Sequence, residues 1–83
     1  MEIKVIGVDS KNGIKLMKNI EKVEKEMKLK FNVSKVSSQN RDKYGIREVP
    51  ALMIDDDIIS KGCILTEREI KNIIKEKMEV CIN

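Results

Sequence analysis

The stretch Tyr44-Gly45-Ile46-Arg47-Glu48-Val49-Pro50-Ala51-Leu52-Met53-Ile54 decides the fold of this chain. It contains the only proline, the only tyrosine and an unbroken apolar run from Ala51 to Ile54. Because proline has no N–H to give to a sheet, it suits the first residue of a strand, and it holds the residue before it extended. The stretch therefore predicts a polar turn followed by a buried strand that begins at Pro50.

Apolar spacing and turn residues on either side of this stretch predict the other elements. Alternating or continuous apolar runs predict strands, spacings of three and four predict helices, and Asp-rich or Gly-containing segments predict turns. The expected elements are a strand over Ile3–Val8, a helix from Ile14 to about Lys28, an edge strand over Phe31–Val36, a short helix within Ser37–Lys43 ending at Gly45, strands over Pro50–Ile54 and Ile58–Lys61 joined by a turn at Asp55–Asp57, and a helix that starts at Thr66.

The two long helices carry recognisable signals. Leu16, Ile20, Val23 and Met27 form one apolar stripe in the first, and Glu21–Lys25 and Glu24–Lys28 have the spacing of stabilising ion pairs on a solvated face. In the last helix, Thr66 and Glu69 form a capping box, and a buried stripe is expected at Ile70, Ile73 and Ile74. Residues 78–83 form a tail to which no element is assigned.

The pattern Tyr44-Gly45-Ile46-Arg47, two residues, then Pro50-Ala51-Leu52 resembles the approach to the cis-proline in thioredoxins and their small glutaredoxin-sized relatives. The resemblance covers roughly residues 3–74. It implies one thioredoxin-like domain over residues 1–83, an α/β/α sandwich in the order β-α-β-α-β-β-α. It also implies a four-stranded mixed sheet of order 2-1-3-4 with helices on both faces, and a cis Val49–Pro50 peptide bond.

The same resemblance shows which chemistry is missing. Thioredoxin-like oxidoreductases have Cys-x-x-Cys at the start of the first helix, where the helix N-terminus stabilises a thiolate. Here that turn is Ser10-Lys11-Asn12-Gly13, with Ser10 and Gly13 at the two cysteine positions. A serine cannot form a disulfide, and as a helix N-cap it has an ordinary structural role. No catalytic residue is therefore assigned.

Two cysteines remain, Cys63 and Cys81. Cys63 is a candidate lone thiol: if the hairpin turns within Asp55–Asp57, it lies across from Pro50, and Lys61 and the start of the last helix are close to it in sequence. The alternative is a small packed residue without a role. Cys81 is interpreted as an incidental tail residue, because the intervening helix separates it from Cys63 by much more than a disulfide spans.

Composition narrows the function further. The chain has 83 residues, no histidine, two aromatic residues and a net charge of +3 with both signs interspersed. The absence of histidine excludes Ser–His and Cys–His catalysis, and the Asp55–Asp57 run lacks the pattern of a calcium loop. We therefore expect no cofactor, no metal and no nucleic-acid partner. We also expect no membrane partner and a cytoplasmic location, because the chain has neither a signal peptide nor a membrane-spanning run.

Three functions are compatible with these observations. The first is a redox-inactive binding module, not an enzyme, in which Ser10, Lys11, Asn12, Gly13, Val49, Pro50, Gly62 and Cys63 hold a protein or peptide partner. The second is a single-thiol redox protein or sensor that acts through Cys63. The third is a subunit-like interaction domain that uses an edge strand or the last helix. A monomer or weak dimer is expected in each case.

Overall fold

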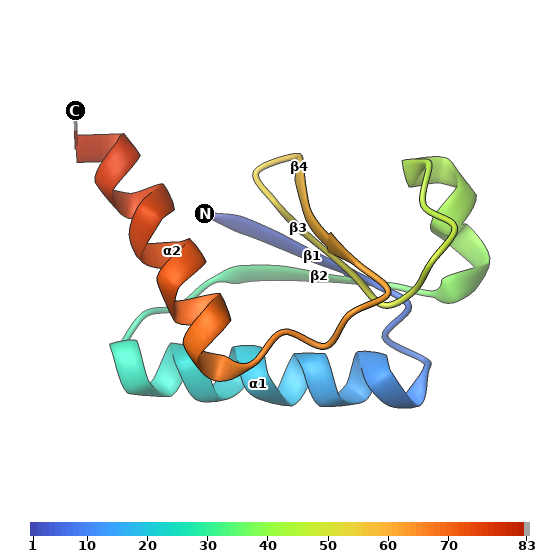
Figure 1. Ribbon diagram of the computed structural model, residues 1–83, viewed down its shortest axis with the longest axis horizontal. Coiled ribbons are helices and arrows are strands. Elements are labelled where there is room, and N and C mark those ends of the chain that lie inside the picture. Colours follow the sequence, from blue (N-terminus) through green and yellow to red (C-terminus); the bar gives the residue numbers. More distant parts are fainter. Residues whose placement is uncertain (83) are drawn as a thin grey trace.

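A computed structural model describes the backbone of residues 1–82 and the side chains of residues 1–78. The elements follow one another as β1 (Glu2–Ile6), α1 (Lys11–Met27), β2 (Asn32–Val36), the 3₁₀ helix η1 (Ser38–Tyr44), β3 (Ala51–Ile54), β4 (Asp57–Lys61) and α2 (Glu67–Ile82), as Figure 1 shows. The predicted order of strands and helices is confirmed.

The four strands form one mixed sheet in the order β2-β1-β3-β4, which confirms the predicted topology. β1 and β2 are parallel because α1 connects them, whereas β1–β3 and β3–β4 are antiparallel. Ile54 pairs with Asp57, so only Asp55 and Asp56 form the hairpin turn, with φ of 47° and 72°. Two successive positive φ values are typical of tight hairpins, and Asp tolerates them well.

Both long helices pack on the same face of the sheet, and Figure 1 shows α1 below the sheet and α2 at its left. Fully buried side chains from β1 and β3, such as Val5 and Leu52, meet the apolar stripes of α1 and α2 there. The predicted stripe residues Leu16, Ile20 and Val23 have no exposed surface, and Ile70 and Ile74 are also buried. The main core therefore lies between the sheet and this helical layer.

The other face of the sheet is covered only in part. A second, smaller core of Ile6, Ile46, Ala51 and Met53 lies there, with Tyr44 at the end of η1 packed against it. The third layer is thus one short 3₁₀ helix and the segment after it. Further along this face Ile58 on β4 is 45% exposed.

Several boundaries differ from the prediction for local reasons. β1 ends at Ile6 because Gly7 turns the chain with φ of +89°. α1 begins at Lys11 because Ser10 caps it, so Ser10–Gly13 is the cap and first turn of the helix. α2 continues through the tail to Ile82.

The predicted ion pairs on α1 are wrong. Neither Glu21–Lys25 nor Glu24–Lys28 is among the salt bridges of the described residues. Glu24 Oε2 instead accepts a hydrogen bond of 2.9 Å from the Phe31 N–H, and so fixes the turn between α1 and β2. Lys71 on α2 pairs with Glu26 and ties the two long helices together.

Candidate functional site

Three segments meet at the end of the sheet where α1 begins. Gly7, at the end of β1, packs so closely on Val49 that a Cβ atom on Gly7 would lie 2.6 Å from the Val49 Cβ. Pro50 accepts a 2.9 Å hydrogen bond from the Gly62 N–H after β4. The first turn of α1 lies against Gly7 in turn. The structure therefore brings together the predicted residues Ser10–Gly13, Val49, Pro50 and Gly62.

The Ser10 hydroxyl forms two hydrogen bonds within this turn. It donates to the Gly7 carbonyl at 2.7 Å and accepts from the Gly13 N–H at 3.0 Å. The Ser10 N–H also donates to the Gly7 carbonyl, at 3.1 Å. These three bonds make Ser10 the N-cap of α1 and link the helix to the end of β1, so its hydroxyl has a structural role.

Gly13 is buried beneath the same carbonyl. A Cβ atom at this position would lie 2.0 Å from the Gly7 oxygen and 2.9 Å from both the Gly7 carbonyl carbon and the Val8 Cα. All three are backbone atoms, which cannot swing away as a flexible side chain can. The second cysteine position of the family pattern therefore has no room for any side chain in this backbone arrangement.

The Val49–Pro50 peptide bond is cis. Pro50 is buried, whereas Val49 is half-buried and precedes β3. Within the described part of the chain, neither the N–H nor the C=O of Val49 takes part in a hydrogen bond. Val49 therefore offers one free backbone donor and one free acceptor at the centre of the site.

Cys63 directly follows Gly62, whose N–H donates a hydrogen bond to the Pro50 carbonyl. Gly62 has φ of +68°, and a Cβ atom there would lie 2.8 Å from Glu48 Oε2, so this position also suits glycine. Cys63 is exposed and free. The side chain of Cys81 lies outside the described residues, so its predicted separation from Cys63 stays a prediction.

Asp9, in the loop just before α1, has a shifted pKa. Asp9 accepts hydrogen bonds of 2.8 Å from both the Ser38 N–H and the Ser38 hydroxyl. These bonds, the backbone one first, lower the pKa of Asp9 below its ordinary value of 3.8 because they favour the charged carboxylate. Asp9 thereby ties the loop before α1 to the start of η1.

Sequence reasoning missed Gly7, whose lack of a side chain lets β1 pack closely on both Val49 and Gly13. The available signal was its place inside the predicted strand Ile3–Val8, where a glycine marks a bend or a close backbone approach. Across the described residues, no three side chains of the His, Cys, Asp or Glu type gather as metal ligands do. Within the same residues, no helix has the length and apolar character needed to cross a bilayer.

Comparison with known proteins agrees with this geometry. A family model described as a thioredoxin domain matches residues 1–75, which include every element of the site. A search of the curated proteins finds no match.

Proposed function

This chain belongs to the thioredoxin domain family, and from that premise we propose that it is a redox-inactive binding module. It binds its partner at the surface beside the cis-proline, which we call the groove, and it lacks the dithiol. Its partner is a protein or a peptide, and it works as a monomer or weak dimer in the cytoplasm. The groove is formed by the turn Ser10–Gly13, by Val49 and Pro50, and by Gly62 and Cys63.

The observation that carries this proposal is the closed start of α1. A dithiol oxidoreductase uses one thiolate to attack a disulfide sulfur and a second thiol to resolve the mixed disulfide. Ser10 supplies neither because it has no sulfur, and its hydroxyl is hydrogen-bonded to the Gly7 carbonyl and the Gly13 N–H. Gly13 leaves no space for a second thiol, because the Gly7 oxygen occupies the place of its Cβ.

The binding half of the proposal rests on Val49. Its unpaired N–H and C=O can accept an extended peptide as an additional short strand, which is a common way for a sheet to bind a peptide. Exposed Lys11 and Asn12 on one side and exposed Cys63 on the other would contact the side chains of that peptide.

Peptide selection followed by NMR mapping tests this function. Peptides selected from a random library on the immobilised protein should shift the backbone amides of Lys11, Asn12, Val49 and Cys63 in the ¹⁵N-labelled chain. Cys63→Arg should abolish that binding by filling the groove, whereas the matched control Cys63→Ser should preserve it. Selected peptides that shift other amides and bind Cys63→Arg normally would contradict the proposal.

A second candidate function rests on the exposure of Cys63. Its thiolate could attack a disulfide R–S–S–R′, forming Cys63–S–S–R and releasing R′–S⁻, without a second thiol in the protein. Incubation with glutathione disulfide followed by mass spectrometry of the intact chain tests this. A single glutathione adduct that disappears in Cys63→Ser supports a single-thiol role, and an unmodified chain excludes it.

A further inference from the structure

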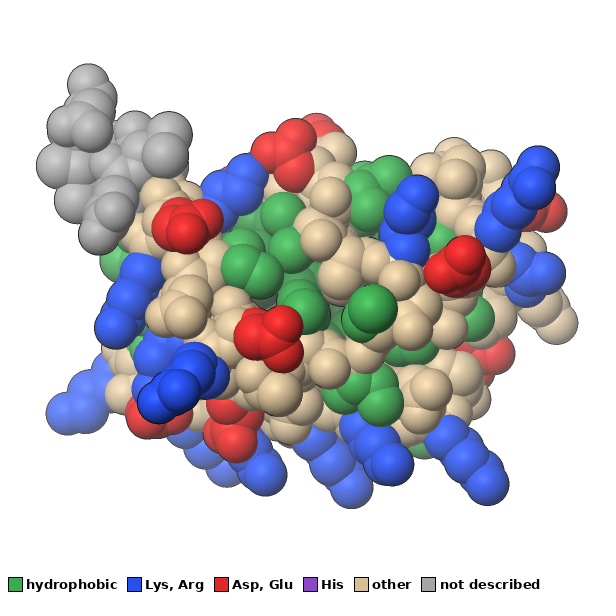
Figure 2. All heavy atoms as spheres, in the orientation of Figure 1, with side chains coloured by type: hydrophobic (Ala, Val, Ile, Leu, Met, Phe, Trp, Pro, Cys, Tyr) green, Lys and Arg blue, Asp and Glu red, His purple; other side chains and the backbone are tan. Residues whose placement is uncertain are grey.

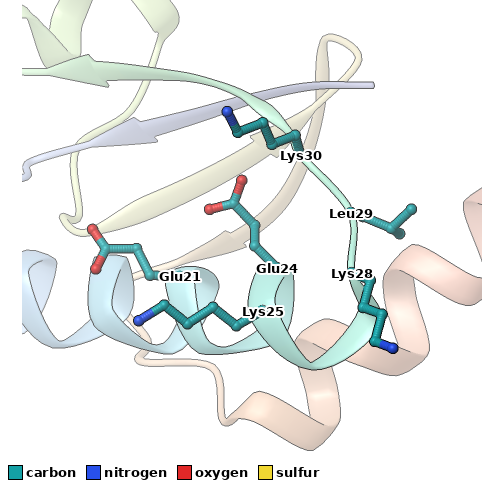
Figure 3. Close-up of a pocket in the computed structure, with 6 residues that line it drawn as sticks. All are labelled: Glu21, Glu24, Lys25, Lys28, Leu29 and Lys30. Carbon is teal, nitrogen blue, oxygen red and sulfur yellow. The ribbon is translucent and has the colours of Figure 1, made fainter.

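A second surface, away from the groove, lies along the side of α1 that faces β2. It consists of two hollows that meet at Glu21, which lines both. The hollow near the end of α1 has a volume of about 460 Å³ and is lined by Glu21, Glu24 and Lys25 of the helix and by Lys28, Leu29 and Lys30 of the turn that follows, as Figure 3 shows. We call the two hollows together the α1–β2 trough.

The hollow near the start of α1 has an apolar floor. It has a volume of about 300 Å³, and Val8, Ile14 and Met17 line it together with Lys18 and Lys35. Ile14 is 48% exposed although it is a large apolar residue on the first turns of the helix. This hollow can therefore receive one apolar side chain of a partner.

The trough also contains an excess of positively charged residues. Lys18, Lys25, Lys28, Lys30 and Lys35 line it, with Glu21 and Glu24 as its two acidic residues. Removing these from the 17 basic and 14 acidic residues of the chain leaves 12 of each sign, so the excess of +3 lies here. Figure 2 shows that basic side chains also project along α1, at the lower edge of the molecule.

The lysines of the trough are available to a partner. All five are exposed, and none of them forms an ion pair within the described residues. Glu24 is engaged by the Phe31 N–H, which leaves Glu21 as the one acid of the trough without a hydrogen bond in the described chain. A negatively charged partner would therefore meet mostly unpaired cations.

We propose that the α1–β2 trough binds an acidic polypeptide segment that carries one large apolar side chain. Its carboxylates would lie along the lysines, and its apolar side chain would enter the hollow formed by Val8, Ile14 and Met17. The proposal goes beyond the groove at Pro50 and does not depend on it.

Other anionic partners fit this surface less well. A helix that binds a membrane uses its own apolar face, but on α1 that face, with Leu16, Ile20 and Val23, is buried in the core. Single-stranded nucleic acids bind aromatic stacking platforms and arginines, and the trough contains neither. A polypeptide can supply both the carboxylates and the apolar side chain.

Fluorescence anisotropy with defined probes tests the proposal. The first probe is a dye-labelled peptide of alternating Glu and Ser with one central Leu, and the second has Ala in place of that Leu. A thymidine oligonucleotide of equal charge and vesicles containing phosphatidylserine serve as competing anions. We expect saturable binding of the Leu peptide at about 20 mM salt, weakened strongly at about 200 mM salt, where screening is shorter in range.

Charge-reversal variants locate the binding. The triple variant Lys18→Glu, Lys25→Glu and Lys35→Glu should weaken binding of the Leu peptide by at least about tenfold. The matched control Lys43→Glu, Arg68→Glu and Lys75→Glu makes the same change in net charge at exposed positions of η1 and α2, and should weaken it by less than about twofold. Ile14→Ser should reduce the advantage of the Leu peptide over the Ala peptide.

Four results would overturn the proposal. They are the absence of saturable binding at low salt, equal weakening by the two triple variants, equal affinity for the Leu and Ala peptides, and tighter binding of the oligonucleotide or the vesicles than of the Leu peptide. The circular dichroism spectrum of each variant shows whether it is folded, so a loss of binding is compared only among folded proteins.

Discussion

Replacing Gly13 with alanine tests whether the start of α1 is closed to side chains. The substitution adds one methyl group at the third residue of a helix. On helix propensity alone it should stabilise the protein by up to about 1 kcal/mol, because alanine favours helices more than glycine does. The geometry predicts the opposite sign, since the new Cβ would lie 2.0 Å from the Gly7 oxygen.

The size of the effect follows from what must move. Forcing a methyl group into a closely packed site costs about 1–3 kcal/mol. If the Gly7 carbonyl shifts, its bonds from the Ser10 N–H and the Ser10 hydroxyl weaken, and each contributes about 0.5–1.5 kcal/mol. After subtracting the helix propensity of alanine, the expected net loss of stability is roughly 2–4 kcal/mol.

Urea unfolding followed by circular dichroism measures this change. The midpoint should fall with little change in slope, because the surface exposed on unfolding stays the same. Gly45→Ala is a suitable control: Gly45 has φ of +68°, but a Cβ there meets nothing within 4 Å. It should cost only about 1 kcal/mol, from backbone strain. If Gly13→Ala is neutral or stabilising, the closed site is refuted.

Three further predictions test neighbouring parts of the structure. In a background of Cys63→Ser and Cys81→Ser, the thiol introduced by Ser10→Cys should have a pKa below the ordinary value of about 8.5, because it lies at the N-terminus of α1, and ultraviolet titration of the thiolate checks this. Thr66→Ala should destabilise the protein by about 1 kcal/mol, since it removes both hydroxyl bonds of the capping box with Glu69, while Thr66→Ser should be close to wild type in urea unfolding. Asp9 has a lowered folded pKa, so its stabilising effect is present above 3.8 and is lost as the pH falls through that lowered value; the stability difference between wild type and Asp9→Asn should therefore shrink as the pH falls below 3.8, and a difference that does not change with pH would contradict the assignment.

The fold could be predicted from local signals because several agreed. The apolar run after Pro50, the hairpin at Asp55–Asp57 and the capping box at Thr66 each specify one structure, and the structure contains all three. The predicted register placed Cys63 across from Pro50, and the structure puts its neighbour Gly62 there: Ala51 pairs with Lys61, and the Gly62 N–H donates to the Pro50 carbonyl. The start of the first helix was predicted less well: although Ser10 was interpreted as an N-cap, the helix was expected from Ile14, where the apolar residues begin, and α1 starts at Lys11.

The closure of the site could not be predicted from sequence. It depends on the contact between the carbonyl of Gly7 and the position of Gly13, and that distance is set by the angle at which β1 leads into α1. The trough was missed for a similar reason. Lys35 on β2 and Lys18 on α1 line one hollow only because the crossover places the strand beside the helix. Along the sequence, the same lysines look like a solvated face.

A disulfide reductase assay on the wild-type protein tests the central claim most directly. The rate at which dithiothreitol reduces a protein disulfide is measured with and without the chain. Since Ser10 and Gly13 stand at both thiol positions and Gly13 has no room for a side chain, the two rates should be equal. A rate that rises in proportion to the concentration of the chain would contradict the account.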